Sequence, residues 1–404
     1  MSSLCAGYCL LAMTNEEYIL LHREDDVRHL ALKGMPEDVD RDFVLRQIEG
    51  RQLALHKLPV WAQTEGILYP PRLSMEQCSG ELAARYKRQL VLRLLPEGRE
   101  TMADLTGGFG VDFSCLAPLF AESYYVERQE NLCMAAAHNM SLLGIRQAKI
   151  ECEDAETFLD KYAKHYTLLY IDPSRRDEAG RKVFALHDCT PDVAHLGETL
   201  LRMSDVTVVK LSPMLDVDDV LRKVPGVREV HVVSVGGECK ELLLVMRFRS
   251  LGDEVQVFCA NLGDSDDVFS VRRTPHVPDV ADSVGAYLYE PNASILKAGV
   301  QDALCSAYGV KKLHPFSHLF TSSGRVDGFP GRTFEVESVS DFGKRSLKAL
   351  LSRLGKANLA VRNFPSTVAQ LRKKWGLKEG GDDYLFATTL KDGSHALILC
   401  RKCQ

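Results

Sequence analysis

The sequence predicts an α/β fold: a mostly parallel sheet preceded by a helical region and followed by small α+β domains. Between about residues 100 and 215, short apolar runs alternate with helical stretches, as in a sheet covered by helices. Two more strands then follow with only about three residues between them. Residues 253–404 mix short strands and helices without a fixed-period repeat.

Composition narrows the class of protein. With 404 residues and 45% hydrophobic content, the chain can bury an ample core and should form two to four domains. Its net charge of −5 gives no global signal for nucleic-acid binding, although a local basic patch remains compatible with it. The first twenty residues lack a basic start and a continuous apolar run. We therefore expect a soluble, cytoplasmic protein with reduced thiols and no membrane partner.

Residues 1–75 are expected to form an N-terminal helical region. Apolar residues recur with helical spacing within 36–62, and Pro70 and Pro71 then interrupt the pattern. A further helix is predicted within 80–96, whose apolar residues share one broad face: Leu82, Tyr86, Leu90 and Leu94.

Residues 76–250 are expected to form the main α/β domain. Five apolar runs predict its parallel strands: 102–105, 123–127, 148–152, 167–172 and 206–212. The strands predicted at 227–235 and 239–248 are joined by a link too short for a parallel crossover. They must therefore form an antiparallel hairpin.

Two small α+β domains are expected after the sheet, at 253–331 and 332–404. The second reads helix, strand, helix, strand, strand. The cysteine pair Cys400 and Cys403 has a spacing found in zinc sites, but we expect no metal. The C-terminal part of the chain is locally basic, which makes it a candidate RNA-binding surface; the alternative is an ordinary solvent-exposed face. The basic residues are Arg325, Arg332, Arg345, Lys348, Arg353, Arg372, Lys373 and Lys374.

A glycine-rich loop follows the first predicted strand, in the stretch MADLTGGFGVD. Ligands in open α/β sheets bind at the carboxyl ends of the strands. Gly107, Gly108 and Gly110 would let the backbone turn tightly and approach a ligand closely. The helix expected near Asp112 would present free N–H groups beside this loop.

Two classes of cofactor are compatible with such a loop. A dinucleotide site favours the pattern G-x-G-x-x-G, but Phe113 occupies the third glycine position. Asp104 and Asp112 would also repel a pyrophosphate. Asp104 instead suits a cationic amino-acid group, which favours S-adenosyl-L-methionine (SAM). In that case Thr106 and Asp112 belong to the cofactor loop together with the glycines.

Later strand ends add to the predicted cofactor site. Glu127 ends the second strand, where a carboxylate accepts hydrogen bonds from ribose hydroxyls in either cofactor class. Arg128 follows it. Asp154 ends the third strand and is placed to accept from an adenine amino group, while Ala155 leaves room for the ring.

The fourth strand runs directly into Asp172 and Pro173. With the loop DLTGGFGVD, Glu127 and the segment DPSRR, residues 76–250 resemble the class I SAM-dependent methyltransferases. The terminal hairpin is similar to that of their seven-stranded, Rossmann-like sheet. The segments EQCSGELAARYK and NFPSTVAQLRKKWGLKEGGDDYLFATTL resemble bacterial methyltransferases with a C-terminal THUMP-like domain. This resemblance implies a ferredoxin-like domain at 253–331, a THUMP-like domain at 332–404 and RNA as the substrate class.

The segment DPSRR departs from the pattern of amino-methylating relatives, which carry Asp/Asn-Pro-Pro and an aromatic residue. Ser174 stands at the second proline position and Arg175 at the aromatic position. An arginine plane stacks on bases and pairs with phosphate, so Arg175 keeps base methylation open. Ser174 would contact the target through its hydroxyl. Two further segments are compatible either with a site role or with a plain structural one: Tyr86-Lys87 and Lys210-Leu211-Ser212-Pro213.

The predicted function is SAM-dependent methylation of RNA by direct displacement, with a base nitrogen favoured as acceptor. Asp172, Pro173, Ser174 and Arg175 are the candidate catalytic residues. One alternative is a catalytically inactive methyltransferase fold that binds RNA, suggested by the missing Pro-Pro-aromatic sequence. A weaker alternative is an NAD-dependent oxidoreductase, which Phe113 and Asp104 disfavour.

Overall fold

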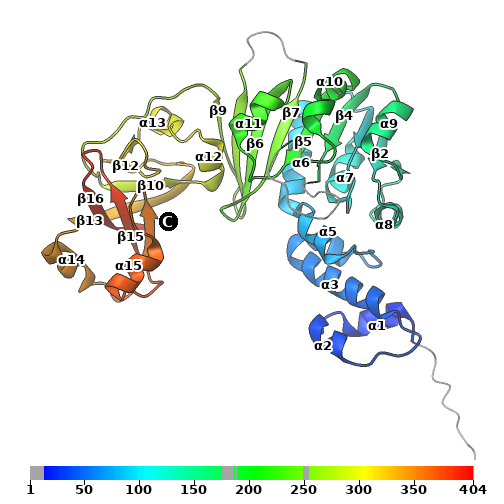
Figure 1. Cartoon of the computed structure of the whole chain (residues 1–404), viewed down its shortest axis with the longest axis horizontal. Coiled ribbons are helices and arrows are strands. Elements are labelled where there is room, and N and C mark those ends of the chain that lie inside the picture. Colours follow the sequence, from blue (N-terminus) through cyan, green and yellow to red (C-terminus); the bar gives the residue numbers. More distant parts are fainter. Residues whose placement is uncertain (1–12, 175–185, 187–188, 249–253, 404) are drawn as a thin grey trace, which may run out of the picture. The chain divides into compact units, whose positions relative to one another are not determined.

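The computed structural model describes residues 13–174, 186, 189–248 and 254–403. The chain divides into two compact units (Figure 1). The first runs to Lys210 and adds 224–226 and 246–248. The second comprises 211–223, 227–245 and 249–404. Arg175 and Arg176 of the predicted segment DPSRR lie outside the described residues.

A nine-stranded sheet has the order β3-β2-β1-β4-β5-β7-β6-β8-β9. The pairs β1–β2, β1–β4, β2–β3 and β4–β5 are parallel, as predicted from the alternation of strands and helices. Strand order reverses between β1 and β4, the position where open α/β sheets bind ligands. The strands are β1 Thr101–Asp104, β2 Glu122–Val126, β3 Ala148–Glu151, β4 Tyr166–Ile171, β5 Ser204–Leu211, β6 Val227–Val235, β7 Glu238–Met246, β8 Gln256–Leu262 and β9 Asp267–Arg272.

The predicted hairpin is β6 and β7, which are neighbours in the sheet. Gly236 and Gly237 link them and have φ values of 59° and 80°, a conformation that glycine adopts without steric cost. Two strands beyond the predicted seven then continue the sheet. β8 pairs in parallel with β6, and β9 pairs antiparallel with β8. The outer side of β6 is thereby paired rather than left as an exposed edge.

The N-terminal region is helical, as predicted. Side chains cap several of its helices: Thr14 accepts from the Glu17 N–H, and Asp40 accepts from the Phe43 N–H. Gly50 of the third helix lies against Tyr69, which precedes the fifth helix, so closely that an added Cβ would come within 2.2 Å of the tyrosine Cβ. The helices are α1 Asn15–His22, α2 Val27–Leu32, α3 Arg41–Lys57, α4 Pro59–Gln63, α5 Arg72–Gln77 and α6 Glu81–Leu94.

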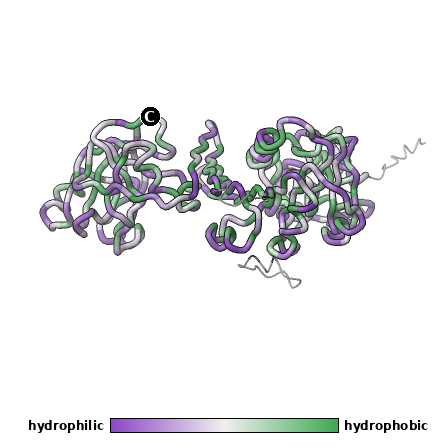
Figure 2. The backbone as a smooth tube through the Cα atoms, turned by 90° about the horizontal axis from the view of Figure 1, so that it is seen from above, coloured by the Kyte–Doolittle hydropathy of each residue, from purple (hydrophilic) through white to green (hydrophobic). Residues whose placement is uncertain are grey.

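Hydrophobic and hydrophilic residues alternate along the backbone of both units (Figure 2). All six residues of β4 are buried, as expected for a central parallel strand. The described part of the chain contains no helix with the length and hydropathy of a membrane span. The remaining helices are α7 Val111–Leu116, the 3-10 helix η1 Ala117–Leu119, α8 Glu130–Leu142, α9 Ala155–Lys161, α10 Val193–Met203, α11 Val217–Lys223, α12 Ala293–Ala298, α13 Ala303–Tyr308, α14 Lys344–Leu351 and α15 Val368–Trp375.

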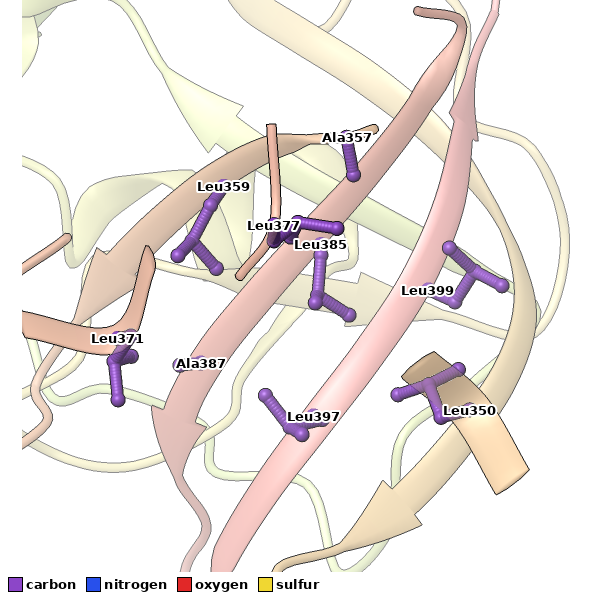
Figure 3. Close-up of a cluster of buried hydrophobic side chains, with 9 residues drawn as sticks. All are labelled: Leu350, Ala357, Leu359, Leu371, Leu377, Leu385, Ala387, Leu397 and Leu399. Carbon is purple, nitrogen blue, oxygen red and sulfur yellow. The ribbon is translucent and has the colours of Figure 1, made fainter. Parts of the chain in front are cut away.

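A second sheet of seven strands has the order β11-β12-β10-β13-β16-β15-β14. On one face, side chains of β14, β15 and β16 pack with Leu350 of α14 and Leu371 of α15 (Figure 3). Phe386 and Ile398 belong to a second buried cluster, because successive residues of a strand point to opposite faces. The strands are β10 Tyr287–Pro291, β11 Lys311–Lys312, β12 Phe320–Ser322, β13 Gly331–Asp341, β14 Asn358–Arg362, β15 Asp383–Thr389 and β16 His395–Lys402.

Candidate functional site

The glycine-rich loop lies at the carboxyl end of β1, between β1 and α7. Gly107 is required by packing, since an added Cβ would come within 2.2 Å of the Tyr125 ring. Gly110 has φ = 88° and would bring a Cβ within 2.7 Å of the Met140 methyl carbon. At Gly108 the nearest atom to a Cβ would be a backbone oxygen at 3.8 Å. Two of the three glycines thus accommodate protein side chains, and only Gly108 borders open space.

Hydrogen bonds fix this loop against the end of β2. The Gly107 N–H donates to the Val126 carbonyl at 2.7 Å, and the Tyr125 hydroxyl donates to the Gly108 carbonyl. The Gly108 N–H donates to Glu127 Oε2 at 3.0 Å, and the Gln129 N–H donates to Oε1 at 2.9 Å. The Glu127 carboxylate is therefore held in one orientation at the sheet edge, where it is almost buried.

Asp104, the last residue of β1, is buried with 1% of its surface exposed. Its Oδ1 accepts from the Thr106 N–H at 3.1 Å. Burial raises the pKa of Asp104 well above its ordinary value, and the nearby charges of Asp112, Asp172 and Glu127 raise it further. No basic side chain in the described part of the chain forms an ion pair with it. A bound cation would compensate this carboxylate.

Asp172 follows β4 and lies beside the glycine loop. Its N–H donates to Thr106 Oγ1 at 2.6 Å, which joins the two predicted motifs directly. The Asp172 side chain is 35% exposed, and Pro173 is buried. Ser174 is exposed, and its backbone exchanges hydrogen bonds with Thr190 at 2.8 and 2.9 Å. The structure thus presents Asp172 and Ser174 at the edge of the sheet.

Asp112 makes its contacts with protein groups rather than with open space. Its Oδ2 accepts from the hydroxyls of Ser79 and Tyr170, both at 2.7 Å. Lys87 of α6 lies 3.1 Å from Oδ1 and also donates to Ser79 at 3.0 Å. Burial alone would raise the pKa of Asp112, but Lys87 and Lys210 hold it below its ordinary value.

Lys210, near the end of β5, connects Asp112 with Asp172. Its Nζ lies 3.8 Å from Asp112 and donates a hydrogen bond to Asp172. The sequence alone does not decide the role of Lys87 or Lys210 and suggests none for Ser79 or Tyr170. For Lys210 one signal is available: it lies near the end of a predicted strand, as Asp172 does. Their contact follows only from β4 and β5 being neighbours.

Of the remaining predicted cofactor residues, Arg128 lies just after β2, and Asp154 and Ala155 lie at the start of α9. Asp154 caps α9, where its two oxygens accept from the Thr157 N–H at 2.9 Å and from the Thr157 hydroxyl at 2.8 Å. The hydrogen bond from the Thr157 backbone lowers the pKa of Asp154. Ala155 is buried, whereas Arg128 is exposed. The N-capping of α9 is sufficient to explain why position 154 is an aspartate. Each carboxylate oxygen of Asp154 can nevertheless accept a further hydrogen bond from a ligand.

The N-terminal helices contribute a cover for the glycine loop. The ring of Phe109 packs against Trp61 at 4.6 Å between centroids and against Tyr69 at 6.1 Å. Two side-chain amides hold the segment that carries Tyr69. Gln47 exchanges two hydrogen bonds with the Tyr69 backbone, and Asn139 does the same with the Leu68 backbone. The loop is thus enclosed on this side by aromatic side chains, which the sequence did not predict.

These residues are compatible with SAM. Asp104 is a buried carboxylate that lacks a cationic partner in the described part of the chain, which suits the ammonium group of the methionine moiety. Each oxygen of Glu127 accepts one backbone N–H and keeps capacity for ribose hydroxyls. The loop backbone at Gly108 has space for an approaching ligand.

Comparisons with known proteins identify the domains and the family of the chain. Residues 331–402 match the family model of a THUMP domain-like domain, and residues 287–330 match that of a ferredoxin-like domain. A search of curated proteins found no match. A solved structure of a candidate methyltransferase from Porphyromonas gingivalis W83 superposes with a TM-score of 0.85 at 34% sequence identity. That alignment covers 96% of this chain and 98% of the other.

Two more distant solved structures align with a smaller part of the chain. An rRNA methylase from Streptococcus thermophilus is 16% identical, with a TM-score of 0.31 over 41% of this chain and 95% of the other. A candidate methyltransferase from Streptococcus mutans, in complex with S-adenosylhomocysteine, is 12% identical, with a TM-score of 0.32 over 40% of this chain and 95% of the other. The full-length match decides the family: the chain belongs to the bacterial class I methyltransferase family that carries a C-terminal THUMP-like domain.

Proposed function

We propose that the protein is a SAM-dependent methyltransferase that acts on RNA, with a base nitrogen as the favoured acceptor. The observation that carries this proposal is the set of three carboxylates at adjacent strand ends. Asp104 ends β1, and Glu127 and Asp172 directly follow β2 and β4, the two neighbours of β1 in the sheet. They surround the point at which the strand order reverses. Acidic side chains around one position favour a cationic ligand over a phosphate-bearing one.

The roles of these residues follow from their positions. SAM would supply a methyl group bonded to a positively charged sulfur. Asp104 would bind the ammonium group, and Glu127 would accept from the ribose hydroxyls. Asp154 and Ala155 would border the adenine. Asp172, with the backbone of Pro173, would hold the acceptor in line with the methyl group, so that the enzyme acts mainly by orientation. The exposed Ser174 hydroxyl is available to the same acceptor.

A dinucleotide is disfavoured by the packing of the loop. Phe113, at the third glycine position of the dinucleotide pattern, is fully buried. Its ring packs edge-on against Tyr125 with 5.5 Å between centroids. A glycine there normally permits the close packing of helix and strand. In this chain an aromatic ring fills that space instead.

The C-terminal domain supports RNA as the substrate. Residues 344–378 contain no Asp or Glu, although the whole chain has a net charge of −5. Both α14 and α15 pack on the same apolar cluster, so their outer residues lie on one side of the sheet. We call the exposed cations of α14 and α15 the basic helical face: Lys344, Arg345, Lys348, Lys373 and Lys374. Such a concentration of positive charge suits a phosphate backbone.

Aromatic rings accompany the basic helical face. Phe342, just before α14, stacks on Phe364 with 4.8 Å between centroids and an angle of 22°. Trp375 of α15 lies 6.2 Å from Phe342. All three rings are only partly buried. Partly exposed aromatic rings beside cations are a common combination in proteins that bind single-stranded nucleic acid.

The test is transfer of a labelled methyl group from SAM to total RNA of a strain that lacks the gene. We expect wild-type protein to label this RNA and Asp172→Ala to lose at least about 100-fold in rate, since the acceptor is no longer held in line. Nucleoside analysis of the labelled RNA then identifies the modified base. Binding of RNA without transfer by the wild type would favour the inactive RNA-binding alternative.

A further inference from the structure

The catalytic edge contains a basic residue that the proposed function has not used. In the parallel pair of β4 and β5, Ile171 stands opposite Val209. One residue further along, Asp172 therefore stands opposite Lys210. Neighbouring residues of paired strands point to the same side of a sheet. This register explains why the Lys210 ammonium reaches the Asp172 carboxylate and donates a hydrogen bond to it.

Lys210 is itself held by buried groups. Its Nζ lies 3.8 Å from Asp112, and Asp112 lies 3.1 Å from Lys87. The four side chains form an ion ladder of alternating charge, Lys87–Asp112–Lys210–Asp172. Their side chains are 1%, 9%, 11% and 35% exposed in that order. The ladder thus leads from the interior to the one carboxylate that remains accessible to an acceptor.

A gain in folding stability is a weak explanation for such a ladder of buried charges. Removing charges from water is costly, and apolar side chains of similar size often stabilise a protein as well or better. Fixed orientation is a stronger reason. Ser79 and Tyr170 both donate to Asp112, so the middle of the ladder is anchored on α7, β4 and the segment before α6. Lys210 is consequently held in place on the side away from Asp172.

We infer that Lys210 is a positioning residue of the methyl-transfer reaction: it fixes the Asp172 carboxylate and leaves one of its oxygens for the acceptor. This inference rests on the proposed function. The hydrogen bond from Lys210 occupies Oδ2 of Asp172. Oδ1 then remains for an N–H of the acceptor. Asp112 belongs to the ladder and reaches the reaction through Lys210, which is a different role from the cofactor contact that the sequence suggested.

This arrangement fits an uncharged amine as acceptor. When its lone pair forms the new C–N bond, the C–S bonding electrons return to sulfur, and the positive charge moves from sulfur to the acceptor nitrogen. The acceptor nitrogen then gives up a proton to solvent water and becomes neutral. A carboxylate oxygen in a fixed position beside that nitrogen stabilises the charge as it develops. Lys210 would determine that position.

The test is a double-mutant cycle of Lys210→Met and Asp172→Asn. Methyl transfer from labelled SAM is measured with total RNA of a strain that lacks the gene as the probe. We expect Lys210→Met to lower kcat by roughly 10- to 100-fold through misplacement of Asp172. The Kd for S-adenosylhomocysteine should stay within about threefold, because Lys210 does not touch the donor in this scheme. In the Asp172→Asn background, Lys210→Met should change kcat by less than about threefold, since its partner is already altered.

Two controls separate positioning from loss of structure. Lys210→Arg keeps the charge and should restore kcat to within about fivefold of the wild type. Lys312 is a similarly buried lysine of the second unit, 2% exposed and paired with Asp302, and Lys312→Met should leave kcat unchanged. Thermal unfolding without ligand provides a further readout. The double variant should lose less stability than the sum of the single variants, because both members of the pair are removed together.

The outcomes discriminate between the two proposals. If the wild type transfers no methyl group, the proposed function fails. If the wild type is active and Lys210→Met keeps its kcat, the positioning role is overturned. Additive effects of Lys210→Met and Asp172→Asn on kcat would overturn it as well. So would a large loss of affinity for S-adenosylhomocysteine with kcat unchanged, since Lys210 would then act on the donor.

Discussion

At the scale of single residues, the site depends on how differently its carboxylates are compensated. Asp112 has two lysines and two hydroxyls around it, and Asp172 has Lys210. Glu127 accepts two backbone N–H groups. Asp104 accepts a single backbone N–H and is the most deeply buried of the four. It is therefore the carboxylate that gains most from a bound cation.

This difference predicts a pH dependence for donor binding. Burial holds the pKa of Asp104 above its ordinary value of 3.8, and binding of a cation would lower it again. Affinity for S-adenosylhomocysteine should therefore rise with pH until the raised pKa of the free protein is passed, and then level off. Calorimetric titrations from about pH 5 to pH 8 would measure this. Asp104→Asn should weaken binding by at least about tenfold and flatten the pH profile.

The Asp104 carboxyl group affects folding stability with the opposite pH dependence: its contribution to stability falls as pH rises. Because the pKa of Asp104 is higher in the folded protein than in the unfolded chain, its contribution favours the folded state below pH 3.8 and is lost as pH rises through the raised value. Asp205→Asn, at an exposed carboxylate, serves as the control for both measurements. A pH profile of binding that is unchanged in Asp104→Asn would contradict the role given to Asp104.

Gly107 yields a second prediction at this scale. A Cβ at Gly107 would lie 2.2 Å from the Tyr125 ring, and neither the ring nor the loop can move without disturbing the hydrogen bonds between them. Gly107→Ala should lower the free energy of unfolding by about 1–3 kcal/mol. Gly34→Ala, at an exposed position with nothing within 4 Å, should change it by less than about 0.5 kcal/mol. Chemical denaturation would measure both, and equal effects would refute the packing argument.

At the scale of elements, the segment between α4 and α5 places the aromatic cover over the glycine loop. Asn139 of α8 is fully buried and satisfies both the N–H and the carbonyl of Leu68. Asn139→Ala would leave two backbone groups without their partners, so the free energy of unfolding should fall by about 1–3 kcal/mol. Gln52→Ala, which removes hydrogen bonds to exposed carbonyls only, should cost less than about 0.5 kcal/mol.

The elements themselves were largely predictable from the sequence. The apolar runs at 102–105, 167–172 and 206–212 coincide closely with β1, β4 and β5, because local periodicity reports burial on one or both faces. Strand pairing is a long-range property, and local periodicity carries no information about it. Nothing local indicated that β8 would pair with β6, or that Lys210 would stand opposite Asp172. The strand-end carboxylates could be proposed from the sequence, whereas the ion ladder needed the strand order.

At the scale of the whole molecule, charge is distributed unevenly. The chain has a net charge of −5, whereas the stretch 344–378 is free of acidic residues. If the basic helical face binds RNA, its affinity should fall steeply with salt, because phosphate contacts release counterions. The amino-acid composition is compatible with a local basic patch but does not locate one. The structure shows that α14 and α15 pack on one face of the second sheet.

This surface gives the prediction at the molecular scale. Lys373→Gln combined with Lys374→Gln should reduce the slope of log K against log salt by about 1–2, because each lysine that no longer neutralises a phosphate lowers the slope by about one. Filter binding of labelled total RNA between about 50 and 200 mM KCl would measure the slope. Lys223→Gln combined with Lys240→Gln, at two lysines that already pair with acidic neighbours, is the matched control. Equal slopes for the two double variants would show that RNA does not bind through α15.

The most direct measurement is a crystal structure of the protein with S-adenosylhomocysteine. We expect the ligand at the carboxyl ends of β1 and β2, with its ammonium group within about 3 Å of Asp104 and its ribose hydroxyls within about 3 Å of Glu127. A ligand bound at another place, or one that touches neither carboxylate, would contradict the account.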